Sequence, residues 1–87
     1  MEKFEMETLE IKGEKIETWK FKINTDNKTS IKLLKEIVDY INGTNIKLVI
    51  DPIDKIFAYI YLYPQEIFTP PDRDFFIERI NKIVELI

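Results

Sequence analysis

The stretch IFAYIYLY, residues 56–63, decides the fold of this 87-residue chain. It holds no charged residue, and β-branched and aromatic side chains dominate it, which predicts a strand. In a strand, successive side chains point to opposite faces. One face would therefore be aliphatic and the other aromatic: Ile56, Ala58, Ile60 and Leu62 on the first, and Phe57, Tyr59, Tyr61 and Tyr63 on the second.

The position of this strand in its sheet follows from the same pattern. A strand with one face in water alternates apolar and polar residues, and this stretch does not. An uncharged, β-prone segment on an open edge would also promote aggregation. We therefore predict an inner strand whose aliphatic face packs on helices and whose aromatic face is covered or used.

Three further strands are predicted, over residues 4–11, 15–23 and 46–51. The second and third alternate well, and Trp19 of the second is expected in the core. In the first strand the apolar parity switches near Thr8, which predicts a bulge or a late strand start. Gly13-Glu14 is the expected hairpin turn between the first two strands.

Two amphipathic helices complete the pattern. Apolar residues recur at helical spacing over 31–41, with Thr29 or Ser30 as the expected N-cap and Gly43 after the last turn. The segment Thr69-Pro-Pro-Asp72 predicts the start of a second helix that runs to the end of the chain.

These elements predict an α+β fold of order ββαββα. Two helices with one apolar stripe each must cover something apolar, and a four-stranded antiparallel sheet with both helices packed on one face satisfies that need. We predict a single domain, residues 1–87, with an internal pseudo-repeat of residues 4–43 and 46–87.

Composition argues against most chemical functions. The chain has no Cys and no His, so no disulfide, no thiolate or imidazole metal site and no histidine base can form. No spacing of the remaining polar residues resembles a catalytic set, so we expect neither an enzyme nor a cofactor nor a metal site. No apolar run approaches the roughly 18 residues of a membrane span. We expect a cytoplasmic protein with no membrane partner, and the richness in Lys and Glu is thermophile-like.

The candidate functional surface is the aromatic face. Strand parity places lysines and a valine beside its rings, so the predicted partner-binding residues are Phe57, Tyr59, Tyr61, Tyr63, Lys20, Lys22, Lys47 and Val49. Three interpretations are open: the rings and lysine stems pack on one another and do no more, the face associates with protein, or it stacks bases of single-stranded nucleic acid.

Tyrosine favours protein interfaces, and a net charge of −3 does not favour nucleic acid. We therefore predict a non-catalytic binding module that forms a homodimer or binds another protein partner through this face. The alternative is single-stranded nucleic-acid binding by the aromatic residues with Lys20, Lys22 and Lys47. A further alternative is a small viral or plasmid regulator of a host protein.

Overall fold

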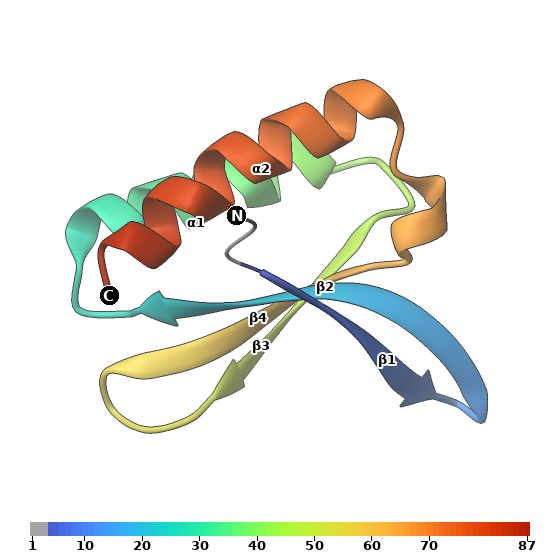
Figure 1. The fold of residues 1–87 in the computed structure, drawn as a ribbon, viewed down its shortest axis with the longest axis horizontal. Coiled ribbons are helices and arrows are strands. Elements are labelled where there is room, and N and C mark those ends of the chain that lie inside the picture. Colours follow the sequence, from blue (N-terminus) through green and yellow to red (C-terminus); the bar gives the residue numbers. More distant parts are fainter. Residues whose placement is uncertain (1–3) are drawn as a thin grey trace.

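The fold is the predicted α+β arrangement of order ββαββα. The computed structural model describes residues 4–87. Its elements are β1 (Glu5–Ile11), β2 (Glu14–Asn24), α1 (Lys28–Ile41), β3 (Lys47–Pro52), β4 (Phe57–Tyr63), the 3-10 helix η1 (Gln65–Ile67) and α2 (Pro70–Glu85). Figure 1 shows both helices on one side of the sheet, with the two hairpins diverging away from the helix layer.

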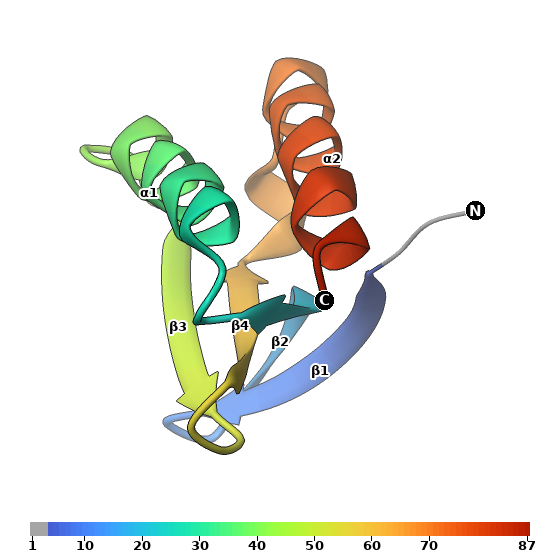
Figure 2. The same cartoon turned by 90° about the vertical axis from the view of Figure 1, so that its left-hand side faces the viewer.

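The sheet has the strand order β1-β2-β4-β3, and every neighbouring pair is antiparallel. Strand β4 thus lies inside the sheet, as the uncharged octet predicted. Each hairpin contributes its second strand to the middle, so β1 and β3 form the two edges (Figure 2).

One core lies between the sheet and the helices. On β4 it takes Ala58, Ile60 and Leu62, which confirms the predicted aliphatic face. Trp19 is also buried there, stacked on Phe4 with ring centroids 4.5 Å apart. The remaining buried members of this core are Phe21, Ile23, Leu34, Ile37, Ile41, Ile46, Phe68, Phe76, Ile80 and Ile83.

The first helix begins earlier than the sequence predicted. The N-cap is Asn27, whose side-chain oxygen accepts hydrogen bonds from the backbone N–H groups of Thr29 at 3.0 Å and Ser30 at 3.1 Å. Asn is among the best N-cap residues because its side chain reaches these otherwise unpaired donors. The prediction of Thr29 or Ser30 as the cap was wrong, whereas Gly43 does follow the helix with φ 81°.

Inside the first turn of α1, the Ser30 side chain is fully buried and its hydroxyl has no hydrogen-bond partner among the described residues. We expect Ser30→Ala to stabilise the protein by about 1 kcal/mol, because it removes an unpaired buried polar group and improves helix propensity. Chemical denaturation measures the change, with the exposed neighbour Thr29→Ala as control. A clear loss of stability in Ser30→Ala would show that the hydroxyl is bonded.

The predicted start of the second helix is confirmed. The Asp72 carboxylate accepts hydrogen bonds from the Thr69 backbone N–H at 2.8 Å and hydroxyl at 2.9 Å, and from the Tyr40 hydroxyl of α1 at 2.8 Å. Partial burial acts to raise the pKa of Asp72, but these hydrogen bonds outweigh it and the pKa is lowered. The same carboxylate raises the pKa of Tyr40. One acidic side chain therefore caps α2 and ties it to α1.

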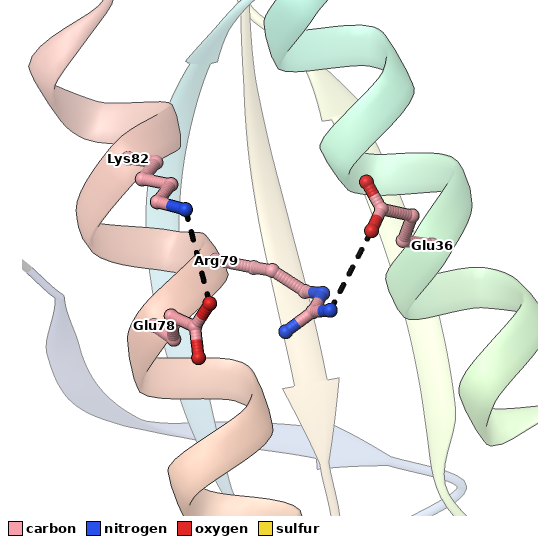
Figure 3. Close-up of polar contacts among 4 residues, drawn as sticks. All are labelled: Glu36, Glu78, Arg79 and Lys82. Carbon is pink, nitrogen blue, oxygen red and sulfur yellow. Dashed lines mark hydrogen bonds and ion pairs between the residues drawn. The ribbon is translucent and has the colours of Figure 1, made fainter.

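Side chains also join the two helices near their middle. Figure 3 shows Arg79 of α2 reaching Glu36 of α1, with 3.5 Å between Nη2 and Oε1, while Lys82 pairs with Glu78 along α2. The Arg79 guanidinium also lies 3.6 Å from the centroid of the Phe75 ring. These contacts help to close the outer side of the helix layer.

The first hairpin corrects two predictions. The β1–β2 register runs without interruption from Glu5 opposite Lys20 to Ile11 opposite Glu14, so there is no bulge at Thr8. The central turn residues are Lys12 and Gly13, both with positive φ, and not Gly13-Glu14. This pair of positive φ values suits the right-handed twist of a two-residue hairpin.

The start of β4 corrects a third prediction. Ile56 precedes the strand and is exposed, although parity placed it on the aliphatic face. The Asp54 carboxylate accepts hydrogen bonds from the backbone N–H groups of Ile56 at 2.7 Å and Phe57 at 2.9 Å. This carboxylate holds the chain in a turn until Phe57.

The candidate interaction face of the sheet

The outer face is the side of the sheet turned away from the helices. Since the aliphatic residues of β4 enter the core, alternation places its aromatic residues on the outer face. Tyr61 lies between Lys20 of β2 and Val49 of β3, and Tyr59 lies between Lys22 and Asp51. The register brings all eight predicted partner-binding residues to this face: Phe57, Tyr59, Tyr61, Tyr63, Lys20, Lys22, Lys47 and Val49.

Lysines of β2 cover part of the aromatic row. The Lys20 Nζ atom lies 4.1 Å from the centroid of the Tyr59 ring and 5.7 Å from that of Tyr61. The Lys22 Nζ atom lies 4.5 Å from the centroid of Phe57. Each such contact contributes about 0.5–1 kcal/mol at a partly exposed site. On the β2 side, the rings and lysines therefore pack on one another.

A carboxylate of β1 fixes one of these lysines. The Glu7 Oε2 atom lies 3.0 Å from the Lys20 Nζ atom. The hydrogen bond to Glu7 is the largest cause of a raised pKa of Lys20. Desolvation acts next and lowers the pKa, but the hydrogen bond and the negative charge of Glu7 together outweigh it. Lys20 is thus engaged by an acid as well as by two rings.

We expect Glu7→Gln to lower the pKa of Lys20 toward its ordinary value of 10.5, and to destabilise the protein at neutral pH by no more than about 1 kcal/mol, because solvent screens the pair. A raised pKa in the folded state means that the ammonium stabilises the fold at pH values below the unfolded pKa. That stability is lost as pH rises through the folded pKa. NMR titration of the lysine Nζ groups gives the pKa.

The stability difference between wild type and Glu7→Gln should therefore shrink above the folded pKa of Lys20. Glu14→Gln, at an exposed position of β2, is the matched control. An unchanged Lys20 titration in Glu7→Gln would contradict the ion pair.

Exposure differs across the outer face. The Tyr61 residue is only 8% exposed although no helix covers this side, so its neighbours on the face bury it. Val49, directly opposite on β3, is 38% exposed. The face is thus closed toward β2 and open toward β3, and its accessible apolar surface lies beside the second edge.

Sequence reasoning missed one part of this face. Leu9 and Ile11 of β1 lie on it, with Ile16 opposite Leu9, and all three are half-buried. Beyond them the Thr18 hydroxyl donates a hydrogen bond to the Glu7 carbonyl at 2.9 Å. The parity switch at Thr8 was the signal, because it marks where apolar residues pass from the helix side to the outer side.

Two further findings hold for residues 4–87. No group of three or more Asp or Glu side chains there is placed to hold a metal ion. Within the same residues, neither helix combines the length and the apolar character needed to cross a membrane. Comparison with protein-family models, with curated proteins and with solved structures found no match to this chain. The geometry of the sheet therefore carries the functional argument alone.

Proposed function

We propose that this protein is a non-catalytic binding module that associates with protein, either a second copy of itself or another partner, through the outer face of its sheet. One observation carries the proposal: an inner strand presents four aromatic side chains on a face that no helix covers. Aromatic rings are large, lose little conformational entropy on binding and are enriched at the centres of protein interfaces.

The open side of the face defines where a partner would sit. Val49 is exposed, and the Tyr59 and Tyr63 rings are half-buried beside β3. Together they offer an apolar centre whose tyrosine hydroxyls can still bond to water or to a partner. Lys47 and Asp51 border this centre and provide a charged rim.

The contacts of the lysines weigh against nucleic acid as the ligand. Base stacking needs free ring faces, and Lys20 lies over Tyr59 and Tyr61. The same ammonium is already paired with Glu7. We therefore expect no binding of mixed single-stranded oligonucleotides in fluorescence anisotropy, even at low salt, where phosphate attraction is strongest.

Light scattering after size exclusion, on samples of increasing concentration, tests self-association through the face. Tyr59→Glu should lower the average mass at a given concentration, because it removes a ring and places a charge in the contact. Lys32→Gln on the exposed side of α1 changes the net charge equally and should leave the mass unchanged. Thermal melting followed by circular dichroism confirms that both variants are folded.

Two results would contradict self-association through the face: equal masses for wild type and Tyr59→Glu, or a monomeric wild type throughout. For a different protein partner, pull-down from a cell extract with wild type and Tyr59→Glu as paired baits gives the matching test. Partners that bind both baits equally would exclude the outer face as their site.

A further inference from the structure

The edge strand β3 has free backbone groups that can pair with another strand. The Ile53 N–H donates to the Phe57 carbonyl of β4 at 3.0 Å. Backbone groups of successive residues point to opposite sides of a strand. The groups of Val49 and Asp51 therefore point toward β4, and those of Leu48 and Ile50 point to the open edge.

Proline confirms this orientation. Pro52 has the same parity as Leu48 and Ile50, so its missing N–H falls on the open edge and costs no bond to β4. Figure 2 shows β3 as the outermost strand below α1, with β4 on its inner side and no other described element on its outer side. The free backbone of this edge is thus Leu48, Ile50 and the carbonyl of Pro52.

Apolar side chains are exposed beside this edge. Ile50 is 52% exposed, and Val38 of α1 is 43% exposed. A shallow groove of about 490 Å³ lies where the end of α1 meets the start of β3, lined in part by Val38, Ile41 and Leu48. Apolar side chains beside free strand backbone are the combination that added strands use.

The charges along β3 are complementary to those of a second, antiparallel copy of the same strand. The strand reads Lys47-Leu48-Val49-Ile50-Asp51-Pro52. In an antiparallel pair centred on Val49, Lys47 of one copy faces Asp51 of the other on the outer face. On the helix side, Leu48 faces Ile50 of the other copy. Opposite charges and apolar pairs directly across two strands both stabilise the pairing.

The backbone fits the same register. Residues whose N–H and carbonyl groups point to the open edge must face each other to exchange both bonds. Centring on Val49 does this, because Leu48 of each copy meets Ile50 of the other. A shift by two residues would separate Lys47 from Asp51 of the other copy. Charge and hydrogen bonding therefore select one register.

The opposite edge lacks this complementarity. Strand β1 carries Glu5, Glu7 and Glu10 and no basic residue, so two copies would bring only negative charges together. A twofold pairing through β3 therefore closes at a dimer and does not extend into a filament.

We infer that two copies of this chain pair through their β3 edges, antiparallel and centred on Val49, to form one continuous eight-stranded sheet. The aromatic faces of the two copies would then adjoin. This contact goes beyond the proposed function, because it uses the strand edge and leaves the outer face uncovered.

Charge reversal tests the inferred register. Asp51→Lys places lysine opposite lysine at both ends of the pairing. The dissociation constant of the dimer should therefore rise by at least about tenfold. Lys47→Asp does the same with two acids. The double variant with both substitutions restores opposite charges, and its dissociation constant should return to within about threefold of wild type.

A mixing experiment provides the sharpest comparison. An equimolar mixture of the Asp51→Lys and Lys47→Asp proteins pairs each acid with a lysine, so the mixture should form heterodimers when each protein alone stays monomeric. Sedimentation velocity measures the wild type, the two single variants, the double variant and the mixture. A dimer that survives either single reversal, or a mixture that stays monomeric, would overturn the register.

Amide hydrogen exchange separates the edge from the outer face. In the edge dimer the Leu48 and Ile50 amides become protected as concentration rises, while face-to-face association leaves them open. Unprotected amides in an associated sample would overturn the edge contact and leave the outer face supported. Loss of dimer in Asp51→Lys, with protection in wild type and no effect of Tyr59→Glu, would support the edge and contradict the outer face.

Discussion

Phe76→Ala is expected to destabilise the protein by about 3–5 kcal/mol, the range for removing a large aromatic ring from a core. Phe76 of α2 is fully buried. Its ring lies 5.1 Å from that of Phe68 and 5.7 Å from that of Tyr40, centroid to centroid, both in edge contact. Trp19 lies 6.4 Å away on the sheet side. The ring therefore joins α1, α2, β2 and Phe68, the residue that follows η1.

A loss of this size is severe for a chain of 87 residues, because domains of this length have about 4–13 kcal/mol of stability in total. Urea denaturation measures the difference, and the melting temperature should fall by about 15 °C or more. Ile67→Ala, at an exposed position of η1, should change stability by less than about 0.5 kcal/mol. Equal effects of the two substitutions would contradict the position of this core.

Substitution of a buried isoleucine on the apolar face of either helix should cause the next largest loss of stability. Ile37 of α1 and Ile80 of α2 are both fully buried against the sheet. Ile37→Ala and Ile80→Ala should each cost about 2–5 kcal/mol, from lost burial and from the cavity left behind. The two helices would then contribute comparably, as expected when both cover one face of the sheet.

Exposed positions on the same helices provide the control for these substitutions. Val38→Ala on α1 removes an apolar side chain that is 43% exposed, and should cost well under 1 kcal/mol in dilute, monomeric samples. Thermal melts of the variants, with the wild type alongside, give the ranking. A negligible change in Ile37→Ala or Ile80→Ala would show that the helix faces are misassigned.

The stretch 56–63 predicted the architecture because its composition left few alternatives. An uncharged strand with two apolar faces must lie inside a sheet, and β4 does. Thr69 to Asp72 predicted the start of α2 because its residue types act locally. Interactions between residues that are close in sequence can be predicted from the sequence alone, and the start of α2 was therefore predicted correctly.

The sequence-based predictions were wrong where several neighbouring residues could play the same role, as at the N-cap of α1, or where the outcome depended on the path of a hairpin, as at Thr8. Asn27, Thr29 and Ser30 can all cap a helix, and the sequence alone does not rank them by distance to the free N–H groups. At Thr8 the apolar residues of β1 change from one face of the strand to the other. This change occurs because the first hairpin extends beyond the helices, and the regular register shows that it needs no bulge. Both outcomes depend on tertiary geometry that periodicity does not contain.

All eight predicted residues lie on the outer face, but Leu9, Ile11 and Ile16 were not predicted there, and neither were the parts of the face that are accessible. Parity placed Lys20 beside Tyr61, yet nothing in the sequence showed that Glu7 would hold that lysine over the rings. Contacts between distant strands close the face toward β2 and leave it open toward β3. The exposed apolar surface therefore lies at the β3 edge, with Val49 and Ile50, and not over the whole aromatic row.

Both proposals make the sheet the surface of association, once across its outer face and once along its β3 edge. The two surfaces adjoin at Val49, which lies on the edge strand and on the outer face. Experiments distinguish the two surfaces by different substitutions. Tyr59→Glu on the inner strand β4 tests the outer face, and charge reversal at Lys47 and Asp51 tests the β3 edge.

Sedimentation equilibrium of the wild-type protein, from micromolar to millimolar concentration, tests this account most directly. The chain has a mass of 10.5 kDa. We predict an average mass that rises with concentration toward twice this value and levels off there. A mass that stays at the single-chain value throughout the range would contradict self-association through the sheet.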